Sequence, residues 1–79
     1  MDKKVTRKIG SFNAATDNGK IISIIIYQDF HIIRSLNKSS QEIPGLKFFE
    51  TASGQAVNMI NENTYEIIGA PESITVKKI

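Results

Sequence analysis

The 79-residue sequence lacks cysteine and tryptophan and contains a single histidine and two prolines. The absence of cysteine excludes disulfides and thiolate metal sites. One histidine leaves few ligand sets for a transition metal, and the eight carboxylates are scattered without the spacing of a calcium loop. We therefore expect neither a metal nor another cofactor.

A strong excess of charge and a long apolar run are missing as well. Ten Lys and Arg residues oppose eight carboxylates, which gives a net charge of +2. The most apolar run, Ile21 to Tyr27, is far shorter than the roughly 20 residues of a membrane-spanning helix. The basic start of the chain is not followed by the apolar stretch of a signal peptide. These features predict a soluble, cytoplasmic protein.

The chain is long enough for one small core. Surface scaling for 8.8 kDa gives about 4,800 Å² folded against about 12,800 Å² unfolded, so that roughly 63% of the surface is buried. With 41% hydrophobic and 23% charged residues, the composition is that of an ordinary globular domain. We expect a single domain that spans residues 1–79.

Isoleucine dominates the apolar residues, with 14 positions against two for leucine. Because β-branched side chains favour strands, the short apolar runs between turn residues predict strands rather than helices. The expected strands cover about residues 4–14, 21–27, 46–51, 56–60, 65–68 and 74–79, and residues 30–35 either continue the second strand or form another. Residues 36–45 are expected to be the one long loop, with room for a single helical turn at 39–42. The pattern predicts an all-β fold, a small antiparallel barrel or sandwich of about six strands with little helix.

Two turn segments resemble each other at an offset of 35 residues. Thr16 and Gly19 in one align with Thr51 and Gly54 in the other. Two similar hairpins that pack as halves of one barrel would produce this pattern, and so would convergence of two unrelated glycine turns.

The segment Ile24-Ile25-Ile26-Tyr27 is apolar on both faces of its strand. It is either a central strand covered within one chain or a strand that pairs across a two-fold axis in a homodimer. The candidate residues for self-association or partner binding are Ile24, Ile26 and Tyr27.

Basic residues are concentrated at the two ends of the chain. If the first and last strands are neighbours, they would merge into one patch that binds single-stranded nucleic acid together with exposed aromatic side chains. The alternative is that the lysines protect an edge strand while the aromatic residues fill the core. The residues of this patch are Lys3, Lys4, Arg7, Lys8, Lys77 and Lys78.

The best catalytic candidate is weak. His31 and Asp29 are two residues apart and share a strand face, but no nucleophile accompanies them. We therefore expect no enzymatic activity.

Several short motifs suggest a relationship to other proteins. Thr51-x-x-Gly54-x-x-Val57-Asn58 is followed by Tyr65-Glu66-Ile67. These motifs resemble short, uncharacterised bacterial β-rich proteins, over roughly the last two-thirds of the chain. The resemblance implies a bacterial or phage origin and a stand-alone domain, with structural roles for Gly54 and Asn58, and it implies no activity.

Together these features favour a small, non-catalytic binding module that acts through a protein partner or as a homodimer. Nucleic-acid binding through the basic ends is the alternative, and an enzyme of unknown type ranks third.

Overall fold

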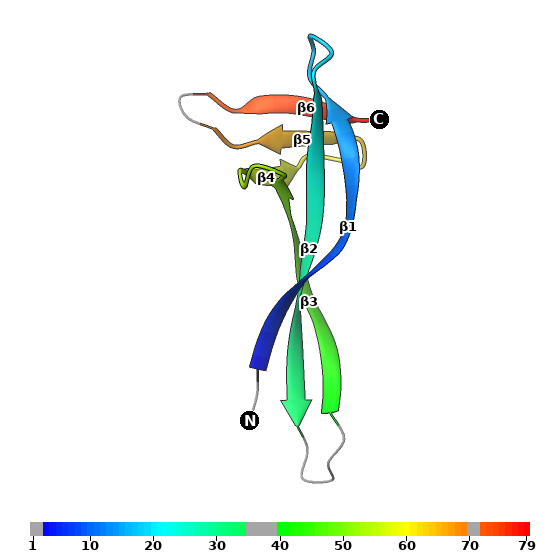
Figure 1. Cartoon of the computed structure of the whole chain (residues 1–79), viewed down its shortest axis with the longest axis vertical. Coiled ribbons are helices and arrows are strands. Elements are labelled where there is room, and N and C mark those ends of the chain that lie inside the picture. Colours follow the sequence, from blue (N-terminus) through cyan, green and yellow to red (C-terminus); the bar gives the residue numbers. More distant parts are fainter. Residues whose placement is uncertain (1–2, 35–39, 70–71) are drawn as a thin grey trace.

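Six strands make up the fold of the computed structural model, which describes residues 3–34, 40–69 and 72–79 (Figure 1). The strands are β1 (Lys3–Ala15), β2 (Ile21–Arg34), β3 (Ser40–Thr51), β4 (Ala56–Met59), β5 (Thr64–Ile67) and β6 (Ile74–Lys78). Each strand pairs antiparallel with the next, and β6 returns to pair with β1. The described residues contain no helix, so the predicted all-β antiparallel barrel is confirmed.

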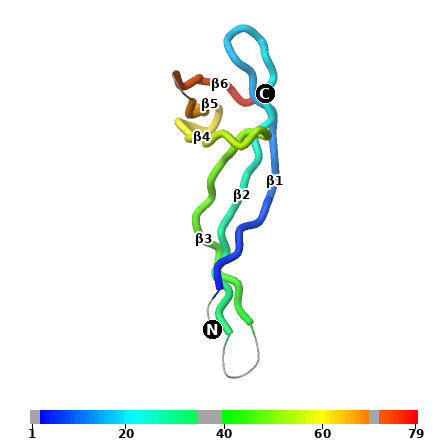
Figure 2. The backbone as a smooth tube through the Cα atoms, turned by 60° about the vertical axis from the view of Figure 1, so that its left-hand side comes forward, coloured from blue at the N-terminus to red at the C-terminus, as the bar shows by residue number. Residues whose placement is uncertain are grey.

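The barrel occupies only one end of the molecule. Beyond it, β1, β2 and β3 continue as a twisted three-stranded sheet, formed by residues 3–8, 28–34 and 40–47, which we call the arm (Figures 1 and 2). The molecule measures 56 × 25 × 20 Å and has a radius of gyration of 16.1 Å. A compact chain of this length would have a radius of gyration of about 12 Å. The arm therefore makes the molecule much longer than the sequence led us to expect.

The core is small and lies inside the barrel. Ile24 on β2 has no exposed surface, and it packs with buried residues from four other strands. The buried hydrophobic residues are Ala14, Ile24, Val57, Tyr65, Ile67 and Val76. The accessible surface is 5921 Å², which exceeds the about 4,800 Å² expected for this mass. The excess reflects an arm that has no core of its own.

β2 is the central strand of both the barrel and the arm. It pairs with β1 on one side from Ile21 to Ile32 and with β3 on the other side from Ile24 to Arg34. The strand is continuous through Gln28 and Asp29, so residues 30–34 continue it. Because both edges of β2 are occupied, this strand has no free edge that could pair across a two-fold axis, and it is a central strand of the sheet.

The two similar turns share one hydrogen-bond pattern. The amide of Gly19 donates to the carbonyl of Thr16 at 3.0 Å, and the amide of Gly54 donates to the carbonyl of Thr51 at 2.9 Å. In both turns the residue after the glycine also donates its amide to the threonine Oγ1 at 3.0 Å. Both glycines have positive φ, 85° and 94°. The sequence similarity at these positions therefore corresponds to the same local structure.

The loop predicted for residues 36–45 is wrong over its second half. β3 begins at Ser40 and includes Pro44, which pairs with Phe30, and Gly45, which lies beside Asp29. Proline is tolerated here because this part of β3 is an edge of the arm and carries a register shift opposite Asp29. The predicted helical turn at 39–42 is absent from residues 40–42, which are strand, and residues 35–39 lie outside the described residues.

Candidate functional site

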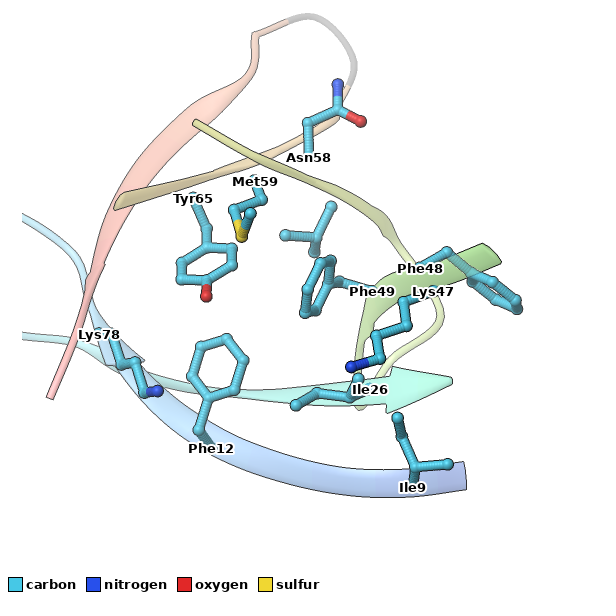
Figure 3. Close-up of a pocket in the computed structure, with 11 residues that line it drawn as sticks. Ile9, Phe12, Ile26, Lys47, Phe48, Phe49, Asn58, Met59, Tyr65 and Lys78 are labelled. Atoms are coloured by element: carbon cyan, nitrogen blue, oxygen red, sulfur yellow. The ribbon is translucent and has the colours of Figure 1, made fainter. Parts of the chain in front are cut away.

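A groove opens where the arm leaves the barrel (Figure 3). It has a volume of about 640 Å³ and is lined by residues from β1, β2, β3, β4, β5 and β6. All six strands can contribute to one opening because a closed barrel brings the inward-pointing residues of every strand to the same interior. At this end the interior-facing side chains continue onto one face of the arm, which we call the inner face.

The floor of the groove is aromatic. Phe12, Phe49 and Tyr65 come from β1, β3 and β5 and point toward one another (Figure 3). The Phe12 ring centroid lies 4.8 Å from that of Tyr65 and 6.3 Å from that of Phe49, and the Phe49 and Tyr65 centroids are 5.4 Å apart. Tyr65 is buried, whereas the two phenylalanines are half-buried. The phenylalanine rings can therefore contact a ligand while remaining anchored in the core.

Two lysines stand at the groove. The Lys78 ammonium lies 5.1 Å from the centroid of the Phe12 ring, and Lys47 enters from β3 on the other side of the opening. The eleven residues that line the groove include these two cations and no carboxylate. Both lysines are exposed. The groove therefore combines an apolar, aromatic floor with uncompensated positive charge.

Charge is also unevenly distributed along the whole molecule. The described arm carries six Lys and Arg side chains against two carboxylates, whereas the described barrel carries three against five. The arm has a net charge of +4 and the barrel a net charge of −2. The net positive charge of the arm therefore attracts an anionic ligand to the side of the groove that faces the arm.

One of the arm cations is partly neutralised. Arg7 and Glu42 form a bidentate ion pair on the inner face, with Nη2 donating to Oε2 at 3.2 Å, and the guanidinium lies 5.2 Å from the Phe30 ring centroid. Hydrogen bonding to Arg7 lowers the pKa of Glu42, and the same pair raises the pKa of Arg7. Because both groups are exposed, this pair contributes little to the stability of the fold.

The predicted basic patch is not brought together. β1 and β6 are neighbours, as the prediction required, but Lys78 and Lys77 pair with Ala14 and Ala15 at the end of β1 that lies in the barrel. Lys8 is six residues further along β1, about 20 Å at 3.3 Å per residue. The four cations of residues 3–8 therefore lie on the arm, apart from the pair on β6.

Strand alternation also divides these cations between faces. Lys78 follows the inward-facing Val76 by two residues and reaches the groove, so Lys77 points outward. Arg7 lies on the inner face with Glu42, whereas Lys4 contacts Asp29 at 3.9 Å on the opposite, outer face. Of the six predicted residues, only Lys78 lines the groove.

The three residues predicted for partner binding have different environments. Ile24 is fully buried in the core, so its side chain is not accessible to a partner. Ile26 lines the groove, and Tyr27 stacks on Phe48 at a centroid distance of 5.3 Å. The strand therefore does not present one contact surface.

Lys47 is the charged groove residue that the sequence analysis did not select. A lysine directly before two aromatic residues, Phe48 and Phe49, is the signal that could have found it. The convergence of Lys47 with Lys78 depends on the strand register across the barrel, which local sequence does not reveal.

The histidine does not form a catalytic pair. His31 is exposed on the arm, between Lys4 and Ile43 in the sheet register. The neighbouring Asp29 accepts a hydrogen bond from Thr6 at 2.6 Å and contacts Lys4. Among residues 3–34, 40–69 and 72–79, no three His, Asp or Glu side chains are grouped so that they could hold a metal ion.

Within the part of the chain that the structure describes, no helix is long and apolar enough to cross a membrane.

Comparison with family models, curated proteins and solved structures finds no match for this chain. The function is therefore argued from the groove and the arm.

Proposed function

We propose that this protein binds single-stranded nucleic acid in the groove between barrel and arm. The observation that carries the proposal is the composition of the groove, which combines Phe12 and Phe49 with Lys47 and Lys78 and has no carboxylate. Small β-barrels that bind single strands combine a positively charged groove with aromatic side chains on which bases stack.

The charge distribution supports one placement of the strand. The net charge of −2 on the barrel disfavours phosphates on its outer surface, whereas the net charge of +4 on the arm favours them there. A strand that leaves the groove along the inner face passes Arg7, which is held by Glu42 next to Phe30. The groove would then contact bases and phosphates, and the arm would extend the phosphate track.

The test is fluorescence anisotropy of a labelled single-stranded oligonucleotide, titrated with protein at several salt concentrations. Each phosphate contact on a single strand contributes about 0.7 to the slope of log K against log salt. We expect Lys47→Ala and Lys78→Ala each to reduce the slope by about 0.7. Lys77→Ala is the matched control, because it removes the same charge from the adjacent residue on the opposite face of β6.

A second variant tests stacking. Phe49→Leu retains an apolar side chain in the floor and removes the ring, and it should weaken binding by about 1–3 kcal/mol for one stacked base. Circular dichroism checks that the variant is folded. The proposal is wrong if the wild-type protein does not bind at low salt, or if Lys77→Ala weakens binding as much as Lys78→Ala.

A further inference from the structure

An exposed apolar strip runs along the outer face of the arm and onto the adjoining residues Tyr27 and Phe48. Leu46 is 82% exposed, Ile43 is 44% exposed and Phe48 is 36% exposed, and all three come from β3. The register places His31 beside Ile43 and Tyr27 beside Phe48 in the same face, because paired antiparallel residues point the same way. Leu46 stands in the register shift opposite Asp29. It directly precedes Lys47, which points to the inner face, and neighbouring residues of a strand point to opposite faces, so Leu46 belongs to the outer face.

Two lysines border this strip. Lys4 is the β1 neighbour of His31, and Lys8 is the β1 neighbour of Tyr27. The outer face of the arm is therefore basic along β1 and apolar along β3. A partner that covers it must be acidic and apolar.

The barrel has that character. The described barrel carries five carboxylates against three cations, and one of these cations, Lys78, lies in the groove. It also exposes isoleucine side chains at 40–72%, namely Ile21, Ile60, Ile68, Ile74 and Ile79. Two chains that lie antiparallel would place the basic arm of each beside the acidic barrel of the other. Such a contact is two-fold symmetric and closed, so that it yields a dimer rather than a filament.

The edges of the arm do not favour other modes of self-association. The free edge of β1 carries Lys3, Lys4, Arg7 and Lys8, which would repel their copies in an edge-to-edge pair. The free edge of β3 contains Pro44 and a register shift, and both features oppose strand addition. The faces are therefore better suited to a partner than the edges.

The area of exposed surface is sufficient for a dimer. The chain exposes 5921 Å², about 1,100 Å² more than the scaling relation gives for a monomer of this mass. A stable interface removes about 800 Å² from each partner.

We propose that the chain forms an antiparallel homodimer in which the outer face of each arm, centred on Leu46, lies against the barrel of the other copy. The inner face stays open in this arrangement, and so does the groove apart from Phe48, which belongs to both surfaces. The dimer therefore leaves Phe12, Phe49, Lys47 and Lys78 accessible to nucleic acid.

Charge reversal in two different variants gives the sharpest test. Each variant contains three substitutions. The arm-reversed variant changes the net charge of the arm from +4 to −2, and the barrel-reversed variant changes the net charge of the barrel from −2 to +4. The arm-reversed variant is Lys3→Glu, Lys4→Glu and Lys8→Glu, and the barrel-reversed variant is Glu50→Lys, Glu62→Lys and Glu66→Lys. Molar mass is measured by light scattering after size exclusion, at low and high salt.

We expect a wild-type dimer that dissociates as salt rises. Each variant alone should be monomeric, because its arm and barrel then have the same sign of charge. An equimolar mixture should recover the dimer mass, because both contacts of the mixed pair join opposite charges. Circular dichroism of each variant separates loss of association from loss of folding.

Leu46 supplies a second, charge-neutral test. Leu46→Ser should raise the dimer dissociation constant at least several-fold, whereas Leu46→Met should leave it within about two-fold because it retains the apolar contact. A wild-type chain that is monomeric at millimolar concentration in low salt overturns the proposal. So does a mixture of folded reversed variants that remains monomeric, which would assign the outer face to a different partner.

Discussion

The paired glycine turns allow a quantitative prediction of stability. Gly19 and Gly54 have φ angles of 85° and 94°, and a Cβ added to either would meet no atom within 4 Å. The effect of alanine is therefore confined to the backbone. The left-handed region costs a residue with a Cβ about 1–2 kcal/mol, and reduced freedom of the unfolded chain returns about 0.4–1 kcal/mol. We expect Gly19→Ala and Gly54→Ala each to lower the free energy of unfolding by about 1 kcal/mol.

Urea denaturation followed by circular dichroism measures this change. A loss of 1 kcal/mol corresponds to a fall of about 4–8 °C in Tm for a chain of this size. Gly10→Ala is the control, because its φ is not positive and its new Cβ would lie 3.7 Å from Ile26 Cδ1. That variant should be neutral or slightly stabilising. Equal losses for Gly10→Ala and Gly54→Ala would refute the backbone explanation, and so would a loss at only one of the two turns.

Three further predictions follow from the core, the second turn and the arm. Ile24→Ala should lower the free energy of unfolding by about 2–5 kcal/mol, measured by urea denaturation, because Ile24 is fully buried. Thr51→Val should cost about 1–3 kcal/mol, because the Thr51 hydroxyl is the acceptor for the Gln55 amide at 3.0 Å in a part-buried turn; faster hydrogen exchange at that amide would locate the effect. The pKa of Glu42 is lowered by Arg7, so the ion pair stabilises the arm fully at pH values above the ordinary carboxyl pKa. This stabilisation is lost as the pH falls through the lowered pKa. NMR titration of the Glu42 carboxyl should show a midpoint below the ordinary value, and Arg7→Gln should return the midpoint toward that value.

The barrel was largely predictable from sequence because its signals are local. Short apolar runs rich in isoleucine mark its strands, and Asp17-Asn18-Gly19 and Ser53-Gly54 mark two of its turns. The arm was not predictable in the same way, because Pro44 ends a strand in most contexts and is tolerated here only by an edge position. Edge position is a property of the whole sheet. It therefore has no local sequence signature.

The candidate site was predictable only in its chemistry. Lysines and aromatic residues were the expected residue types, both kinds line the groove, and Lys78 was among the predicted positions. The groove itself depends on which residues alternate inward on strands that are distant in the sequence. A shift of one residue in the pairing register of β6 would have placed Lys77 in the groove instead of Lys78. The prediction of a single basic patch failed because β6 pairs only with Ala14 and Ala15, at the carboxyl end of β1. The cations of residues 3–8 lie at the other end of this long strand.

The contact between β1 and β6 closes the barrel with very few interactions. Its register joins only Ala14 with Lys78 and Ala15 with Lys77, with one further bond from the Ile79 amide to the Asn13 carbonyl at 3.0 Å. Short, exposed pairings of this kind open first in local fluctuations, so amides of β6 should exchange faster than those of β2. Because Lys78 belongs to this closure, a ligand that contacts Lys47 and Lys78 together connects β3 to β6 across the opening. Binding would then slow exchange in β6, and the weakest junction of the barrel would become the part of the molecule that responds most to its ligand.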